Sequence, residues 1–357
     1  MKYKTILITG GAGFVGSNLA LKFREYDKSI NIIVLDNLYR RGSELSLKIL
    51  RDKGIVFIYG DVRQRLDLLK IKFDLLIECS AEPSFKAGMS GDTDYLVQTN
   101  LDGAINCFEA CKKNNADVIF LSTSRVYPID QINDATYIEE ETRFSLSKDQ
   151  IITGISENGF SEQLALGGHR SFYGATKLSA EYMLSEYLHS YNLKGIINRF
   201  GTIAGPMQLG KVDQGVITFW LVSHMLNKPL AYIGYGGEGK QVRDIIHIDD
   251  VFNLLVLQLN HIESISGDIF NVGGGLSNAI SLAELTKICQ EITGKKISVG
   301  SIAETAKWDL KSYISDNRKI LKTLGWKRSK SVREIIVDTY EWLLSDKEIL
   351  EFFKSSL

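Results

Sequence analysis

The chain has 357 residues, of which 44% are hydrophobic and 24% are charged. This is the composition of a globular protein with enough apolar material for one large domain or two intimate ones. The formal net charge of −1 excludes the broad basic surface that binding to nucleic acid requires, so nucleic acid is not an expected partner.

The start of the chain and its cysteines indicate the cellular compartment in which the protein is expected. Residues 1–4 lead directly into a strand pattern, and no apolar run is long enough to cross a bilayer, so no membrane partner is expected. Cys79, Cys107, Cys111 and Cys289 match no zinc spacing, and no metal is expected. Cys107 and Cys111 lie one helical turn apart and could chelate a soft metal, but small buried hydrophobic residues are the favoured interpretation. A reducing cytoplasm fits these features.

The first half of the chain alternates short apolar runs with stretches long enough for helical crossovers. The best helix candidates begin near Phe14 and near Tyr95. This alternation predicts an α/β fold with a doubly wound parallel sheet, whose ligands lie beyond the carboxyl ends of the strands. The predicted strands are Thr5–Thr9, Ile30–Asp36, Ile55–Asp61, Asp74–Ser80 and Asp117–Thr123.

The pattern breaks between Tyr127 and Arg170, where the sequence is polar. A loop of that length usually serves as a lid or as a functional wrap. A helix is expected at Tyr173–His189, followed by a strand at Gly195–Phe200.

The last part of the chain changes character after Gly201, with glycine and polar residues prominent up to Gly239. A further strand is predicted at Asp268–Val272. Ser281 and Glu284 have the spacing of a capping box for a helix at Leu282–Ile292. The tail from Ser331 to Phe353 is also expected to be helical. These elements predict a smaller carboxyl-terminal lobe.

Four glycines follow the first predicted strand and open the first predicted helix. They are Gly10, Gly11, Gly13 and Gly16, and they fit both a GxGxxG and a GxxGxxG spacing. Glycine permits a tight turn and a close approach of the backbone to a pyrophosphate, while the helix start offers free amides. A glycine cluster alone is compatible with a simple turn. Its place between a strand and a helix favours a dinucleotide site.

Asp36 lies twenty residues after Gly16, at the end of the second predicted strand. A carboxylate there can accept both ribose hydroxyls of an adenosine and repels a 2′-phosphate, so NAD is favoured over NADP. Arg40 and Arg41 are the opposing observation, because they could hold that phosphate. Asp61 ends the third predicted strand, where it either contacts adenine or caps a helix.

Tyr173 and Lys177 are four residues apart and so share one face of a predicted helix. A tyrosine has a pKa near 10, and a neighbouring ammonium favours its phenolate, which makes the pair a candidate general base. Thr123, after Ser122, would hydrogen-bond the reacting hydroxyl at a strand end. A YxxxK pair by itself is often a surface pair. Behind a dinucleotide fingerprint, the combination favours removal of a hydride and a proton from a carbinol carbon.

As a set, these residues resemble the extended short-chain dehydrogenase/reductases that act on nucleotide sugars, and the resemblance covers almost the whole chain. It implies Tyr173 as the base, Lys177 as its partner and holder of the nicotinamide ribose, and Thr123 as the contact to the reacting hydroxyl. The markers are Thr9–Gly16, Asp36–Leu38, Asp61, Asn100–Gly103, Ser122–Tyr127, Tyr173–Lys177, Arg199–Pro206, Arg243 and Asp244 with His247, and Leu324–Trp326.

The resemblance also implies which residues bind each ligand. NAD contacts are expected from Gly10, Gly13, Phe14, Val15, Gly16, Asp36, Asn37, Arg40, Asp61, Val62, Ser80, Ala81, Asn100, Ser122, Tyr173, Lys177 and Phe200. Substrate contacts are expected from Pro83, Ser124, Arg125, Thr202, Gln214, Arg243 and Lys307.

The implied domains are an NAD-binding Rossmann domain at residues 1–200, to which residues 240–273 return, and a nucleotide-sugar lobe at residues 201–239 and 274–357. Arg243 is expected to grip the nucleotide diphosphate through paired hydrogen bonds. The alternative for Arg243 is an ion pair with Asp244 or Asp249.

Within the family, the chain most resembles the 2-epimerases of CDP-linked sugars, in Ser80–Ser84, Val212–Gly215 and Gly239–Asp244. Two departures from family patterns are informative. The dehydratases carry Asp-Glu after the threonine, whereas this chain has Ser124 and Arg125, so water elimination has no evident catalyst. A family arginine is missing near Ala306, where Lys307 is the candidate substitute.

The expected reaction is therefore epimerisation with retained NAD, through a keto-sugar that turns within the pocket. The alternatives are inversion at C4 instead of C2, net dehydrogenation with release of NADH, and a non-catalytic nucleotide sensor. A homodimer or homotetramer is expected from helices near Tyr95–Lys113 and Tyr173–His189, although their apolar residues could all face the sheet.

Overall fold

A computed structural model of the protein describes residues 1–84, 86–88, 91–210 and 214–356. Val212 and Asp213, which contributed to the resemblance, lie outside the described residues. The chain forms two compact units, each built from several segments. Unit 1 consists of residues 1–126, 171–199 and 251–270, and unit 2 consists of residues 127–170, 200–250 and 271–357.

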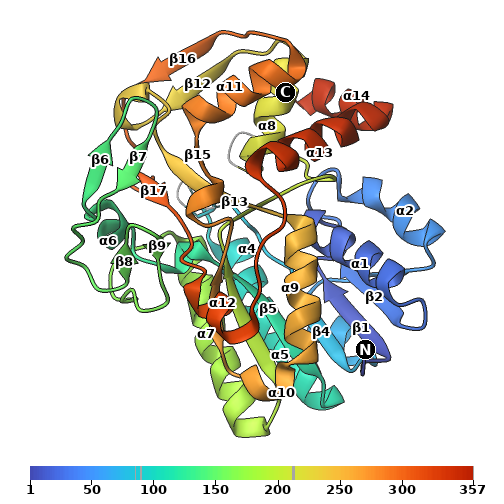
Figure 1. Cartoon of the computed structure of the whole chain (residues 1–357). Helices are drawn as coiled ribbons and strands as arrows, with labels where there is room; N and C mark the ends of the chain where they lie inside the picture. The colour runs from blue at the N-terminus through green and yellow to red at the C-terminus, as the bar shows by residue number, and fades with distance from the viewer. Residues whose placement is uncertain (85, 89–90, 211–213, 357) are drawn as a thin grey trace. The chain divides into compact units, whose positions relative to one another are not determined.

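A seven-stranded parallel sheet forms the centre of the predicted Rossmann fold, which confirms the expected fold class (Figure 1). The strand order is β14-β10-β5-β4-β1-β2-β3. From β1, the strands that come next in the chain are added on one side as far as β3, and the later strands are added on the other side from β4 onward. Open α/β sheets bind ligands at such a switch point. The strands are β1 (Thr5–Thr9), β2 (Asn31–Asp36), β3 (Val56–Tyr59), β4 (Leu75–Glu78), β5 (Asp117–Thr123), β10 (Gly195–Phe200) and β14 (Ile269–Val272).

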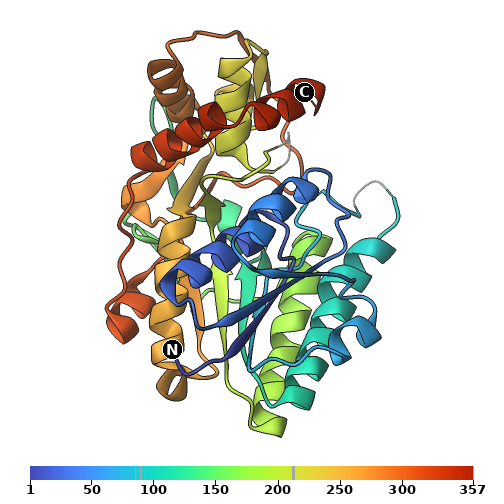
Figure 2. The same cartoon turned by 90° about the vertical axis from the view of Figure 1, so that its right-hand side faces the viewer.

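Helices cover both faces of this sheet, with α1 on one face and α5 and α7 on the other (Figure 2). Alternate side chains of the strands, among them Leu7, Leu76 and Phe120, pack with Phe108 of α5 and Leu184 of α7 in one buried cluster. The helices of this region are α1 (Phe14–Tyr26), α2 (Ser46–Asp52), α3 (Arg65–Leu69), α4 (Asp94–Val97), α5 (Gly103–Asn114), α7 (Phe172–Tyr191), α9 (Ile248–Asn260) and α10 (Ile262–Ile265).

Helix α7 is fixed at both ends and in its middle. The Ser171 hydroxyl caps its start by accepting a hydrogen bond from the Gly174 amide, and Asn192 ends it in a left-handed conformation. In its middle, the buried Glu181 carboxylate accepts hydrogen bonds from Arg199 of β10 and from the Ser122 hydroxyl of β5. A buried charge pair of this kind is costly to break, so α7 is held firmly against the sheet.

Several predicted boundaries differ from the observed ones. The strand predicted to end at Asp61 ends at Tyr59, because the Asp61 side chain turns to bind Arg63. The helix expected near Tyr95 begins as α4 and passes through a π-helical turn, Gln98–Asp102, into α5. The predicted helical tail is two helices, α13 (Val332–Ser345) and α14 (Lys347–Ser356), because Asp346 adopts an extended conformation.

Within the described residues, unit 2 contains four small sheets and several helices. Residues 127–170 carry a helix and two hairpins instead of a structureless loop, and the capping box at Ser281 and Glu284 is confirmed. Its elements are α6 (Ile129–Asn133), β6 (Tyr137–Glu139), β7 (Phe144–Leu146), β8 (Ile155–Ser156), β9 (Gly159–Phe160), β11 (Thr202–Ala204), α8 (Val216–Met225), β12 (Leu230–Ile233), β13 (Val242–His247), β15 (Ala279–Ser281), α11 (Leu282–Thr293), β16 (Val299–Ile302), β17 (Ser312–Tyr313), α12 (Arg318–Leu324), α13 and α14.

Candidate active site

The glycine turn between β1 and α1 has no room for side chains at Gly10, Gly11 and Gly16. Gly10 has φ +62°, and a Cβ atom there would lie 2.8 Å from the Cys79 carbonyl oxygen. A Cβ atom at Gly16 would collide with the Gly10 carbonyl oxygen. Helix α1 then begins at Phe14, after Gly13 at the N-cap position, without a side-chain cap and without an acidic residue in its first turn. The turn thus has the geometry that a pyrophosphate requires.

Asp36, at the end of β2, is tied to this turn. Its carboxylate accepts hydrogen bonds from the Ala12 amide at 3.0 Å and from the Leu38 amide at 2.8 Å. Burial raises the pKa of Asp36 above its usual value, and these amide hydrogen bonds oppose that shift. Each carboxylate oxygen can accept more than one hydrogen bond, so Asp36 retains capacity for ribose hydroxyls.

Asp61 is engaged with neighbouring side chains. Arg63 donates to both of its oxygens, and the Asn37 amide donates to Oδ2 at 2.9 Å. Burial would raise the pKa of Asp61, but the hydrogen bonds from Arg63 and Asn37 outweigh burial and hold the pKa below its usual value. The Arg63 guanidinium also lies over the ring of Tyr95, 4.7 Å from its centroid. Sequence reasoning did not foresee Arg63, whose partner is only two residues away.

Other residues predicted to contact NAD have defined partners inside unit 1. The Asn100 side chain accepts from the Glu82 amide and donates to the Glu82 carbonyl, which fixes the loop after β4. The Ser122 hydroxyl donates to Glu181, and the Ser80 hydroxyl donates to Glu78. Of the remaining predicted contacts, some are half-buried and some are buried in the core. The half-buried ones are Phe14, Val15, Arg40 and Ala81, and the buried ones are Val62 and Phe200.

Tyr173 and Lys177 lie on the first turns of α7, as predicted. Tyr173 is half-buried, and no residue that the structure describes forms a hydrogen bond with its hydroxyl. Thr123 ends β5 and is 8% exposed, and its hydroxyl accepts a hydrogen bond from the Arg125 amide at 3.2 Å. Unit 1 therefore carries the phenol, the ammonium and the threonine together with the glycine turn.

Lys177 has a partner that sequence reasoning missed. Its Nζ lies 3.4 Å from Oε2 of Glu78, the last residue of β4, and 4.0 Å from the centroid of the Phe120 ring. Both charged side chains are only 2% exposed. The signal available in the sequence was an acidic residue at the end of the apolar run Leu75-Leu76-Ile77.

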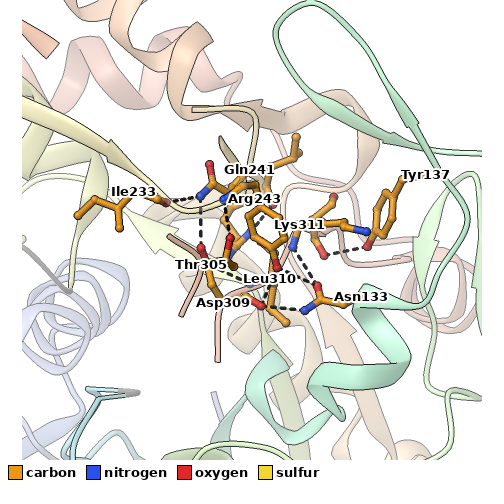
Figure 3. A network of polar contacts seen from close by, with 12 residues as sticks. Asn133, Tyr137, Ile233, Gln241, Arg243, Thr305, Asp309, Leu310 and Lys311 are labelled. Atoms are coloured by element: carbon orange, nitrogen blue, oxygen red, sulfur yellow. Dashed lines mark hydrogen bonds and ion pairs between the residues drawn. The ribbon is translucent and has the colours of Figure 1, made fainter. Parts of the chain in front are cut away.

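Arg243 of β13 lies in a polar network of unit 2 (Figure 3). Its guanidinium donates to the carbonyls of Val242 and Leu310, and its Nη2 lies 3.3 Å from Oδ1 of Asp309. The expected alternative partner, Asp244, instead accepts from the amides of Gly275 and Ser315.

The network leaves Arg243 able to bind an anion. Asp309 also accepts a hydrogen bond from Gln241, which in turn donates to the Ile233 carbonyl (Figure 3). Three of the five guanidinium donors of Arg243 are engaged with described residues, which leaves two for an anionic ligand.

The other predicted substrate contacts occur in both units. Pro83, Ser124 and Arg125 of unit 1 are half-buried, as are Thr202 and Gln214 of unit 2. Lys307 is exposed. Both polar side-chain atoms of Gln214 are buried and lack a partner among the described residues.

The described residues contain neither a membrane-spanning helix nor a cluster of side chains that could hold a metal ion. No helix among them is long and apolar enough to cross a membrane. No group of three or more histidine, cysteine, aspartate or glutamate residues in the described part of the chain could hold a metal ion.

Comparison with known proteins identifies the family. Residues 6–273 match the model of the NAD dependent epimerase/dehydratase family. The chain belongs to this family. The NAD dependence that gives the family its description agrees with the predicted cofactor, and the glycine turn and Asp36 fit such a dinucleotide.

Relatives within the NAD-dependent epimerase/dehydratase family include two curated enzymes of similar length. CDP-paratose 2-epimerase of Salmonella typhi is 28% identical over 95% of this chain and 99% of its own. UDP-glucuronate 4-epimerase of Thermodesulfobacterium geofontis is 27% identical over 98% of both chains.

Solved structures share the fold. UDP-glucuronic acid 4-epimerase of Bacillus cereus, in complex with UDP-glucuronic acid and NAD, has a TM-score of 0.76 and 24% identity, and the match covers 96% of this chain and 99% of the other. dTDP-glucose 4,6-dehydratase of Bacillus anthracis in complex with NAD has the same TM-score at 21% identity, over 97% and 98% of the two chains.

Proposed function

We propose that the protein is an NAD-dependent epimerase of nucleotide sugars, with a CDP-linked sugar as the favoured substrate and C2 as the favoured carbon. The observation that carries this proposal is the phenol of Tyr173, which has no hydrogen-bond partner among the described residues. It lies one helical turn before the buried ammonium of Lys177, in the same unit as the glycine turn and Asp36. The similarity to CDP-paratose 2-epimerase over nearly the whole chain supports the choice of substrate.

The residues of the chain account for the proton chemistry. Tyr173 removes the proton of a sugar hydroxyl, directly or through Thr123, and Lys177 stabilises the resulting phenolate by its charge. The bound dinucleotide supplies the acceptor and donor of hydride at the sugar carbon. Tyr173 later returns the proton after the keto-sugar has presented its other face.

The substrate is held by its nucleotide portion in this proposal. Arg243 offers to the diphosphate two donors that no described residue engages, and Gln214 offers a buried amide that lacks a partner within the same part of the chain. Binding energy from this non-reacting portion keeps the sugar in the site while it turns.

The deciding experiment has two parts. Mass spectrometry of the denatured protein identifies any dinucleotide or nucleotide sugar that co-purifies. Incubation with CDP-linked and UDP-linked sugars, followed by NMR of the products, then identifies the inverted carbon. Inversion at C2 of a CDP-linked sugar without accumulation of NADH is expected. Continuous NADH formation would indicate a dehydrogenase and would overturn the proposal.

Inversion at C4 is the second candidate, because a UDP-glucuronate 4-epimerase is almost as similar as the 2-epimerase, at 27% against 28% identity. The same product analysis separates the two. Dehydration is disfavoured because Ser124 and Arg125 stand where the dehydratases are expected to carry an acidic pair.

We also propose that the protein is a homodimer or homotetramer. Helix α7 presents large exposed side chains, with Tyr182 59% and Tyr191 46% exposed. Light scattering measures the mass directly, and a monomer of 40.0 kDa would contradict this proposal.

A further inference from the structure

Glu78 is a charged residue in a place where charge is costly. It is the last residue of β4, a strand in the middle of the parallel sheet, and it is 1% exposed. Removing a carboxylate from water to this extent costs free energy unless a partner of opposite charge and hydrogen bonds compensate.

Glu78 has both kinds of partner. Its Oε1 accepts a hydrogen bond from the Ser80 hydroxyl at 2.6 Å, and its Oε2 lies 3.4 Å from the Nζ of Lys177. Lys177 is equally buried, and its Nζ also contacts the face of the Phe120 ring. The carboxylate and the ammonium are therefore paired with one another in a place that water hardly reaches.

The other titratable groups near this pair do not replace it. Burial raises the pKa values of the Cys79 and Cys107 thiols well above the usual value, and the Glu78 carboxylate adds to both shifts, so these thiols are neutral at physiological pH. Glu181, one turn after Lys177 on α7, is neutralised by Arg199 of β10.

Among the described residues, Glu78 is the charge partner of Lys177, and its charge bears on what the ammonium can do for Tyr173, which precedes Lys177 by one helical turn. A full positive charge near a phenol strongly favours the phenolate, whereas an ammonium already paired with a carboxylate favours it less. The Glu78 carboxylate thereby sets how strongly Lys177 acts on the base.

We propose that Glu78 is a positioning residue of the active site, which holds the Lys177 ammonium in place and offsets its charge next to Tyr173. This inference rests on the proposed function only in taking Tyr173 as the base. No contact between Glu78 and substrate is part of it.

The test is a spectroscopic titration that needs no substrate. Tyrosinate absorbance is followed against pH in the NAD-loaded protein, and the same titration of Tyr173→Phe is subtracted so that the signal of Tyr173 remains. In Glu78→Gln, Lys177 loses its compensating charge, so Tyr173 is expected to ionise at a pH lower by roughly one unit or more. Glu78→Asp, which keeps the charge, is expected to stay closer to the parent protein.

Glu263→Gln is the matched control. It removes an exposed negative charge that forms ion pairs with Lys2 and Lys194 at the surface. No change in the Tyr173 titration is expected. An unchanged Tyr173 midpoint in folded, NAD-binding Glu78→Gln overturns the proposal.

A second measurement covers the case in which Glu78→Gln does not fold. The double variant Glu78→Gln with Lys177→Met contains no unpaired buried charge, so it is expected to recover folding relative to Glu78→Gln alone. If the double variant also fails to fold while Lys177→Met folds, Glu78 is needed for a reason unrelated to Lys177, and the proposal is wrong.

The outcome is distinguishable from failure of the proposed function. A shifted Tyr173 titration without turnover on any nucleotide sugar would keep the role of Glu78 and remove the epimerase. Epimerase turnover with an unshifted Tyr173 titration would support the proposed function and refute the role of Glu78.

Discussion

The Asp36 carboxylate accepts a hydrogen bond from the Ala12 amide at 3.0 Å, so the end of β2 and the glycine turn form one structural unit. The same carboxylate also accepts from the Leu38 amide. Its orientation is therefore set by the backbone before any cofactor binds.

We expect Asp36→Asn to weaken NAD binding by roughly tenfold to a hundredfold, the effect of losing hydrogen bonds to a charged group. NADP binding should weaken less, because the repulsion of a 2′-phosphate is removed with the charge. Calorimetric titration of both cofactors measures this. Asp52→Asn, an exposed change on α2, serves as the control. Tighter binding of NADP than of NAD to the unmodified protein would contradict the role of Asp36.

Tyr173→Phe should reduce turnover by about 10²- to 10⁴-fold, the range for loss of a general base, with NAD affinity retained. The hydroxyl has no hydrogen-bond partner among the described residues, so its removal should leave the stability of unit 1 nearly unchanged. Tyr182→Phe changes an exposed tyrosine of the same helix and should keep full activity. Undiminished turnover of Tyr173→Phe would exclude this tyrosine as the base.

Arg243→Lys should raise the KM for the nucleotide sugar by roughly tenfold or more with a smaller effect on kcat, because an ammonium cannot reproduce the planar fork of a guanidinium. Steady-state kinetics across substrate concentration separate the two constants. Arg333→Lys, in an exposed pair with Glu291, is the matched control. An unchanged KM would mean that the network with Asp309 is purely structural.

The lowered pKa of Glu284 predicts that the stability of unit 2 depends in part on this carboxyl at acidic pH. Burial would raise its pKa, but hydrogen bonds from Arg143, from the Ser281 amide and from Thr142 outweigh burial and hold the pKa below 4.5. A carboxyl whose pKa is lowered by folding stabilises the protein fully above its unfolded value and loses that contribution as the pH falls through its folded value.

Glu284→Gln should therefore lower the free energy of unfolding at neutral pH and flatten its decrease below about pH 4.5. Urea unfolding at a series of pH values tests this. Glu341→Gln removes an exposed carboxyl from α13 and should leave the slope unchanged. Equal slopes for the parent protein and Glu284→Gln would refute the assignment.

The elements that the sequence predicted well are those with a strong local signal. β1, β5 and β10 have the predicted bounds, because their apolar runs are buried on both faces of the sheet. The cap at Ser281 was recognisable because the capping residues lie three positions apart. The predicted end of β3 was wrong because Asp61 binds Arg63 and Asn37 instead of continuing the strand.

Two of the contacts that sequence reasoning missed join residues that are far apart in the chain. Glu78 lies 99 residues before Lys177, and Arg243 lies 66 residues before Asp309. A single sequence identifies a buried acidic residue or an isolated arginine, but the partner depends on strand order and on the path of the loops. The role of Lys177 was predicted from its helical spacing, whereas the carboxylate that limits its charge emerges only in three dimensions.

The hydrogen bonds that Glu181 accepts from Arg199 and Ser122 have a consequence for stereochemistry. An enzyme with a single acid–base group must either move that group around its substrate or expose both faces of the substrate to a stationary group. A helix anchored to two neighbouring strands by a buried ion pair does not swing during a catalytic cycle. In the proposed epimerisation, the rotation that presents the other face of the keto-sugar is therefore left to the carbohydrate.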